Sequence, residues 1–117
     1  YDLRFPELYR TMALRGVDIV LCPAAWPDVR EHHWTTLSKA RAIENQYFVF
    51  ALNQVGKVTF SRTDAGKSMV IDPWGEVIAS CGTTEEVLRA EIDLTKIKEA
   101  REKIPVLQDR RCDLYEI

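Results

Sequence analysis

The 117-residue sequence predicts a layered α/β fold in which some strands pair antiparallel. The first half of the stretch from His33 to Asn53 lacks Gly and Pro, and its apolar residues recur at helical spacing. The second half contains Tyr47–Leu52, an unbroken apolar run typical of a strand buried on both faces. A helix that leads directly into a buried strand is the unit of layered α/β proteins. Residues 72–75, which lie between two apolar runs, have the composition of a type I turn and indicate an antiparallel hairpin.

Composition and charge argue against several classes of function. The 16 basic and 18 acidic residues leave a net charge of −2 with no block of like charge, so binding to nucleic acid or to a membrane has no support. The longest apolar runs, Ile19–Ala25 and Tyr47–Leu52, are far shorter than the roughly 20 residues of a membrane-spanning helix. Three cysteines without Cys-x-x-Cys spacing indicate free thiols in a reducing compartment, so we expect a cytoplasmic protein.

The first predicted helix covers residues 6–15. Pro6 suits the first position of a helix, and Gly16 suits the position just after its C-terminal end. We expect the buried face of this helix to consist of Leu8, Met12 and Ala13. A short strand, Val17–Cys22, is then expected to face a core on both sides except at Asp18, and to end at Pro23.

A loop over residues 23–33 is expected between that strand and the central helix. Loops at the carboxyl ends of strands are where α/β proteins bind their ligands, so this loop carries the most functional weight. The apolar face of the central helix is expected to contain Trp34, Leu37, Ala40 and Ile43. On the same helix, Arg41 and Glu44 lie about one turn apart and are expected to form a structural ion pair.

Three segments follow the buried strand. Gln54–Lys67 is polar and lacks a clear period, so an irregular connection is expected. Ser68–Asp72 and Val77–Ser80 are the two strands of the predicted hairpin. Val87–Asp93 alternates between apolar and charged residues, which predicts a strand with one solvated face.

The chain ends in a predicted helix and an apolar tail. Asp93 can cap the helix, and Pro105 ends it. We expect its buried face to consist of Leu94, Ile97, Ala100 and Ile104. The tail Val106–Ile117 is too apolar for a free end, so it is expected to dock on its own body or on a partner subunit.

Taken one at a time, the reactive side chains give little support for catalysis. Cys22 lies in an apolar strand without an activating cation, so a buried structural thiol is expected. His32 and His33 are adjacent, so their rings should point apart on any regular element. No further residue at ligand spacing completes a zinc site, and neither histidine has a Ser or Cys partner for a triad. No metal site is predicted.

Arg30, beside Trp26 and His33, is the best cluster for binding a ligand. A guanidinium can bind a carboxylate with two hydrogen bonds while aromatic rings wall the pocket. Considered alone, the residues favour an arginine that is simply solvated on its loop, and the ligand-binding role is the alternative.

Several segments occur in the order found in the carbon–nitrogen hydrolases of the nitrilase superfamily, which this sequence resembles over its whole length. They are Tyr-Asp-Leu-Arg-Phe-Pro-Glu at 1–7, Cys-Pro-Ala-Ala-Trp at 22–26, Ala-Arg-Ala-Ile-Glu-Asn-Gln at 40–46, Asn53, Asp-Pro-Trp-Gly-Glu-Val at 72–77, Ile-Asp-Leu at 92–94 and Arg-Arg-Cys-Asp-Leu-Tyr at 110–115. Trp26-Pro27, Arg30 and His33-Trp34 make the omega-amidase branch the most similar.

The resemblance implies a four-layer α-β-β-α sandwich, of which residues 1–117 are expected to be the C-terminal portion, with about half of each sheet. In this family the nucleophile is a cysteine immediately before the segment that starts here at Tyr1, and a Glu base and a Lys lie further upstream. No catalytic residue is therefore expected in this chain, which should be inactive alone. The resemblance gives the backbone N–H of Tyr1 a part in the oxyanion hole, and Arg4 and Glu7 the support of the elbow.

The implied activity is hydrolysis of a non-peptide carbon–nitrogen bond, with ammonia released from the amide of a short dicarboxylate and no cofactor required. Trp26, Arg30 and His33 are the candidate substrate-binding residues. The implied partners are a small-molecule amide and, through the C-terminal tail, a second copy of the protein. The alternatives are a non-catalytic assembly or binding module on the same fold, and a nitrilase or N-carbamoyl hydrolase.

Overall fold

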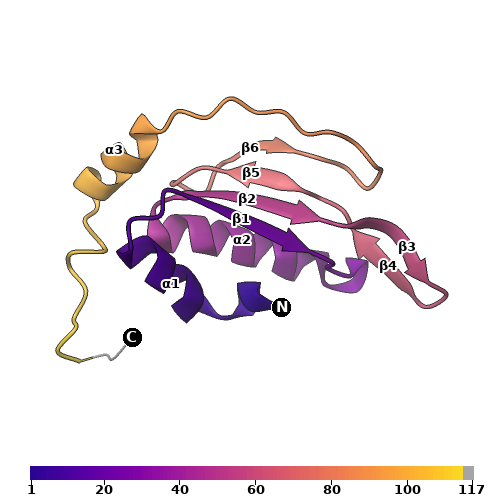
Figure 1. Cartoon of the computed structure of the whole chain (residues 1–117), viewed down its shortest axis with the longest axis horizontal. Helices are drawn as coiled ribbons and strands as arrows, with labels where there is room; N and C mark the ends of the chain where they lie inside the picture. Colours follow the sequence, from indigo (N-terminus) through magenta and orange to yellow (C-terminus); the bar gives the residue numbers. More distant parts are fainter. Residues whose placement is uncertain (115–117) are drawn as a thin grey trace.

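The computed structural model describes residues 1–114, which form a mixed sheet with helices packed on it (Figure 1). Its elements are η1 (Asp2–Arg4), α1 (Pro6–Leu14), β1 (Ile19–Ala24), η2 (Asp28–Arg30), α2 (Glu31–Asn45), β2 (Phe48–Asn53), β3 (Val55–Thr59), β4 (Arg62–Ala65), β5 (Met69–Ile71), β6 (Val77–Ser80) and α3 (Thr95–Lys103). The main sheet has the order β1-β2-β5-β6, in which β1 and β2 are parallel and the other neighbours antiparallel. The predicted α/β fold with mixed pairing is confirmed.

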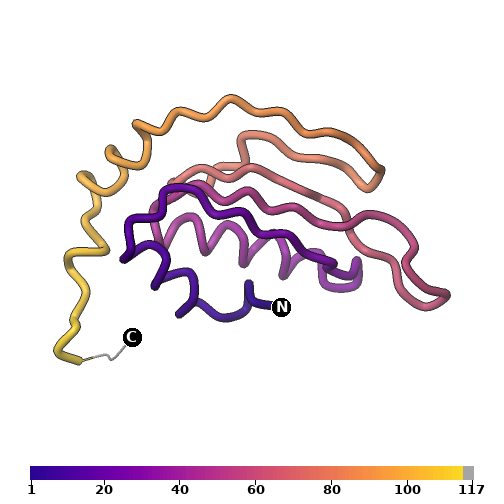
Figure 2. Tube along the Cα trace, in the orientation of Figure 1, coloured from indigo at the N-terminus to yellow at the C-terminus, as the bar shows by residue number. Residues whose placement is uncertain are grey.

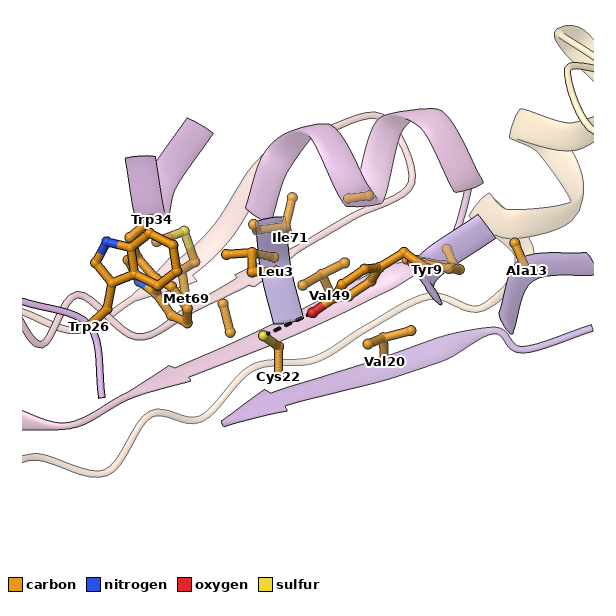
Figure 3. Packing of buried hydrophobic residues seen from close by; sticks show 13 residues of the cluster. Leu3, Tyr9, Ala13, Val20, Cys22, Trp26, Trp34, Val49, Met69 and Ile71 are labelled. Atoms are coloured by element: carbon orange, nitrogen blue, oxygen red, sulfur yellow. Dashed lines mark hydrogen bonds between the residues drawn. The ribbon is translucent and has the colours of Figure 1, made fainter. Parts of the chain in front are cut away.

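The core lies between the sheet and the pair α1 and α2 (Figure 1). Strand β1 alternates, so that Val20 and Cys22 face the helices while Leu21 is 65% exposed on the opposite face. Figure 3 shows Val20 and Cys22 pointing from β1 toward Tyr9 of α1. The prediction that this strand is buried on both sides is therefore wrong for the described chain. The strand also continues through Pro23, which is tolerated because β1 is an edge strand.

Strand β2 was predicted to be buried on both faces, and only its first half is. Phe48 and Val49 are fully buried on opposite faces, whereas Leu52 near the end is 49% exposed. Together with the outward side chains of β1, these residues give the sheet an apolar outer face that no described element covers fully. The members of this open face that are most exposed are Ile19, Leu21, Leu52 and Ile78.

The buried faces of α1 and α2 differ from the predicted ones. Tyr9 and Ala13 are the buried residues of α1, and Leu8 is exposed. The buried residues of α2 are Trp34, Ser38, Arg41, Ala42 and Asn45. Ile43 is 52% exposed, because the helix turns Arg41 and Asn45 inward, where the nitrogen atoms of both side chains donate to buried oxygen atoms.

Arg41 explains why a charged side chain lies in this core. Its Nε and Nη2 atoms donate to the carbonyl of Leu3 at 3.1 and 2.7 Å, and Nη1 donates to Glu44 at 2.8 Å. The guanidinium is thus satisfied on several sides, as burial of a charge requires. The predicted structural pair of Arg41 and Glu44 is confirmed, and it also fixes η1 against α2.

The hairpin of β5 and β6 is confirmed, with Asp72 at its turn. The carboxylate Oδ1 atom accepts hydrogen bonds from the backbone N–H of Trp74 at 2.9 Å and of Glu76 at 3.0 Å, and Oδ2 pairs with Lys96 of α3 at 2.8 Å. Gly75 adopts φ +84° at the turn. The turn therefore combines the predicted residue types with an anchor for the last helix.

Two predictions for the middle of the chain are wrong. Residues 54–67 form the hairpin β3–β4, which Figure 1 shows extending past the end of the main sheet, where Arg62 pairs with Asp64 at 2.9 Å. Residues 87–93 are not a strand, although their sequence alternates; Val87 is 84% exposed. Alternation makes a strand only where a neighbouring strand supplies hydrogen bonds. Figure 2 shows this segment running back along the sheet to α3.

The predicted last helix is confirmed as α3, and Asp93 accepts hydrogen bonds from the N–H and the hydroxyl of Thr95. Gln46 Nε2 donates to the carbonyls of Ala100 and Ile104, which ties the C-terminal end of α3 to the end of α2. On the predicted buried face of α3, Leu94 and Ile104 prove to be exposed and only Ile97 and Ala100 are buried.

The tail after α3 is described as far as residue 114. Leu107 packs against the core, as docking on the body predicts, whereas Leu114 is exposed. The apolar residues Tyr115 and Ile117 lie outside the described residues. Within residues 1–114, no helix combines the length and the hydrophobicity needed to cross a bilayer.

Candidate functional site

A pocket of about 400 Å³ opens between η1 and the loop that follows β1. It is lined by Tyr1, Arg4, Ala25, Trp26, Pro27 and Arg30. The loop thus brings two of the three predicted binding residues, Trp26 and Arg30, to the same hollow as Tyr1. The third, His33, is not part of the lining and reaches the pocket only through its contact with Arg4.

Trp26 is the fixed wall of the pocket. Its side chain is 5% exposed, its indole Nε1 donates to the carbonyl of Arg30 at 2.7 Å, and its ring packs against Trp34 with centroids 5.8 Å apart. Figure 3 shows the two indoles together at one end of the core. Since both polar and apolar contacts hold the ring, it can present a rigid surface to a bound molecule.

Asn53, at the end of β2, holds the backbone of this loop. Its Oδ1 accepts from the N–H of Trp26 at 2.7 Å, and its Nδ2 donates to the carbonyls of Trp26 at 3.2 Å and Gly66 at 2.8 Å. In the sequence, Asn53 belongs to the segments that carry the family resemblance and has no predicted binding role. Its position at the carboxyl end of a buried strand was the signal that could have placed it near the site.

Arg4 is the pocket residue that sequence analysis missed, since it was assigned only to support of the elbow. Its guanidinium carbon lies 4.6 Å from the centroid of the Trp26 ring, a cation–π contact. Its Nη1 and Nη2 atoms lie 3.4 and 3.3 Å from Nδ1 of His33. No local pattern predicts this contact, because the two residues are 29 positions apart.

His32 and His33 lie in the first turn of α2, and their rings touch, with centroids 4.2 Å apart. The prediction that they point apart is wrong. Side chains in the first turn of a helix have no preceding turn to pack on, so their rings can meet. Desolvation lowers the pKa of His33, and the charges of His32, Arg4 and Arg30 lower it further.

Arg30 and Tyr1 are both exposed. The ring of Tyr1 is 83% exposed and touches the Phe5 ring edge-on at 5.3 Å. The carbonyl of Tyr1 accepts from the N–H of Arg4 at 3.0 Å, which forms the turn η1. The part predicted for the N–H of Tyr1 in an oxyanion hole stays a prediction, as does carboxylate binding by Arg30.

Cys22 is buried, as predicted for a structural thiol. Its sulfur lies 3.4 Å from the hydroxyl of Tyr9, the contact drawn as a dashed line in Figure 3. Burial and this contact raise the pKa of Tyr9 well above its ordinary value, so the phenol stays neutral. Cys81 is partly buried and Cys112 is exposed.

Comparison with known proteins shows that the chain is similar to several amidases. The chain is 49% identical over 115 residues to the 2-oxoglutaramate amidase of Bacillus subtilis, covering 98% of the chain and 44% of that protein. It is 45% identical to the deaminated glutathione amidase of Rattus norvegicus, covering 98% of the chain and 36% of the relative. Among solved structures, the NitFhit protein of C. elegans matches with a TM-score of 0.94 and 44% identity, over 99% of this chain and 28% of that one.

These matches confirm the resemblance to the nitrilase superfamily and its amidases. The chain spans less than half the length of these relatives. The family model described as carbon-nitrogen hydrolase matches residues 1–102, which include all of the pocket lining. The chain therefore belongs to the carbon-nitrogen hydrolase family.

Proposed function

We propose that these residues form the C-terminal portion of a cysteine-dependent omega-amidase, which releases ammonia from the amide of a short dicarboxylate. The observation that carries the proposal is the pocket that gathers Tyr1, the rigid indole of Trp26 and the cations Arg4 and Arg30. Positive charge beside an aromatic wall suits a small carboxylate-bearing substrate. Similarity to a 2-oxoglutaramate amidase supports the same substrate class.

The proposed reaction is acyl transfer through a thioester. A glutamate removes the thiol proton of a cysteine next to Tyr1, both supplied by chain outside these 117 residues, and the thiolate attacks the amide carbonyl to form a tetrahedral intermediate. A glutamic acid protonates the nitrogen as the carbon–nitrogen bond breaks, and ammonia leaves. The same group then removes a proton from water, which attacks the thioester and releases the carboxylate and the thiol. The backbone N–H of Tyr1 and a lysine stabilise the oxyanion in both steps.

In this proposal the loop residues bind the part of the substrate that does not react. Arg30 offers hydrogen-bond donors to the free carboxylate, and Trp26 packs against the carbon chain between the two ends. His33 acts from behind the pocket through Arg4, which it contacts at 3.3 Å. No metal or organic cofactor enters the proposed steps.

The same proposal accounts for the open face of the sheet. The described strands do not divide between two sheets of similar size, so the expectation of half of each sheet is wrong. We propose instead that the four-stranded sheet is one inner layer of an α-β-β-α sandwich. The remainder of the protein would then cover the apolar face that includes Leu21 and Leu52. Assembly into a homo-oligomer through the tail is part of this proposal.

The test is ammonia release by a protein that contains these residues together with the preceding half of the domain. Purified protein is expected to release ammonia from 2-oxoglutaramate or succinamate, and replacement of the proposed cysteine with alanine should abolish the release. The 117 residues alone should release none. Consumption of nitriles or N-carbamoyl compounds in place of these amides would reject the omega-amidase assignment.

A further inference from the structure

The side chain of Arg62, on β4, reaches the backbone of the loop that lines the pocket. Its Nη2 atom donates to the carbonyl of Ala25 at 2.7 Å, and its Nε atom pairs with Asp64 at 2.9 Å. Ala25 lines the pocket beside Trp26, whereas Arg62 does not line it. The guanidinium therefore joins a wall of the pocket to a strand that lies outside the pocket.

Asp64 holds this guanidinium from the inside of the molecule. Its side chain is fully buried, and its Oδ2 atom has no hydrogen-bond partner among residues 1–114. Arg62 is the only cation of the described chain within ion-pair distance of it. Because a buried carboxylate without a paired cation is costly, Asp64 keeps the side chain of Arg62, which is 41% exposed, in this one position.

The loop depends on Arg62 at Ala25 more than at its neighbours. The carbonyl of Trp26 accepts a hydrogen bond from the N–H of Ala65 at 2.9 Å, and Pro27 forms an antiparallel bridge with Asp64. The carbonyl of Ala25, in contrast, accepts its only hydrogen bond within the described residues from Arg62. Loss of this guanidinium would therefore free one lining residue of the pocket.

We propose that Arg62 is a positioning residue of the substrate pocket and that buried Asp64 keeps it in place. Arg62 acts through the carbonyl of Ala25 and does not touch the substrate. The inference rests on the proposed function, in which this loop contacts the part of the substrate that does not react. A loop that is fixed before the substrate arrives loses less entropy on binding, so the β3–β4 hairpin strengthens substrate binding without taking part in the chemistry.

The test uses the complete protein and removes the contact without leaving a buried charge. Arg62→Met alone would leave the carboxylate of Asp64 unpaired, so Asp64→Leu is combined with it; replacing both members of a buried pair with apolar side chains often leaves stability unchanged. This double variant is expected to raise KM for succinamate roughly tenfold and to change kcat less than about threefold. Lys57→Met removes another exposed cation of the hairpin, one that contacts Phe60, and should change neither constant.

Arg62→Lys covers the case in which the double variant does not fold, because it keeps a cation beside Asp64. A single ammonium cannot replace the two separate guanidinium nitrogens that bind Asp64 and Ala25, so KM should rise here too. A wild-type KM in either folded variant would overturn the inference. A lower kcat at unchanged KM would also overturn it, since the effect would then lie at the reacting groups.

Amide hydrogen exchange separates this inference from the proposed function, because it needs no substrate. In the double variant, the N–H groups of residues 25–30 should exchange about tenfold faster than in the unmodified protein, and Lys57→Met should leave them unchanged. A protein that hydrolyses no amide but shows this local increase would reject the amidase and keep the positioning role. Unchanged exchange in the loop would reject the positioning role, whatever the activity.

Discussion

The side-chain amide of Asn53 makes two hydrogen bonds with the backbone of Trp26. The amide oxygen accepts a hydrogen bond from the N–H of Trp26 at 2.7 Å, and the amide nitrogen donates one to the carbonyl of Trp26 at 3.2 Å. The pair joins the end of β2 to the loop after β1 in the manner of a neighbouring strand. The position of the pocket wall is thus set by a residue that does not line the pocket.

Replacing Asn53 with alanine removes these hydrogen bonds. The loss of its three side-chain hydrogen bonds should lower the free energy of unfolding by about 2 to 4 kcal/mol. Urea unfolding of the complete protein measures this, with Gln54→Ala at the exposed next position as the control. A loss no larger than that of the control would mean that water replaces the amide at no cost.

Gly75→Ala tests the turn between β5 and β6. An added Cβ would meet Cγ1 of Ile43 at 2.5 Å, and the backbone φ of +84° strains any residue with a Cβ. We expect a destabilisation of about 2 to 4 kcal/mol, from backbone strain and overpacking together. Adding Ile43→Ala should recover the steric part but not the backbone part, which thermal unfolding of the two single variants and the double variant would resolve. Strict additivity would contradict the contact.

The lowered pKa of His33 makes stability depend on pH. Above the ordinary imidazole pKa of 6.5 the ring is neutral in both folded and unfolded protein, and its shift contributes nothing. As pH falls through 6.5, the unfolded chain takes up the proton first, so the folded state loses stability until the folded ring also protonates. His33→Gln should flatten this part of the profile. A profile that rises toward acid pH would mean that the pKa is raised instead.

The 117 residues expressed alone should form a molten or aggregated species. Leu21 and Leu52 lie on an apolar sheet face that the described elements leave open, and the outer edge of β1 has no partner strand among the described residues. Binding of a hydrophobic dye, near-ultraviolet circular dichroism and sedimentation would detect such a state. A soluble monomer with a sharp, cooperative melt would contradict the prediction.

The parts of the fold that depend on neighbouring residues were predictable from the sequence. Asp72, Pro73 and Gly75 specify their turn by backbone preference, and Asp93 marks the start of α3 because its carboxylate accepts from the N–H and the hydroxyl of Thr95. Such signals act over a few positions. They need no knowledge of the tertiary structure.

The rest depends on partners far along the chain. Ile43 fits an apolar helical stripe, yet it is exposed because Arg41 faces inward to the carbonyl of Leu3. Residues 87–93 alternate like a strand but pair with no strand within residues 1–114. The contact of Arg4 with His33 likewise exists only once η1 and α2 meet, so the sequence pointed to the right loop and missed the cation fixed beside it.

The extended segment 81–93 does not determine the position of α3. Gln46 donates to a carbonyl near its C-terminal end, Lys96 pairs with Asp72, and Arg101 pairs with Asp18 at 3.0 Å. These contacts fix the helix independently of the segment that precedes it. Insertions and deletions between β6 and Asp93 should therefore leave the register of every described strand unchanged. We expect related proteins to tolerate changes of length in this stretch without a change of architecture.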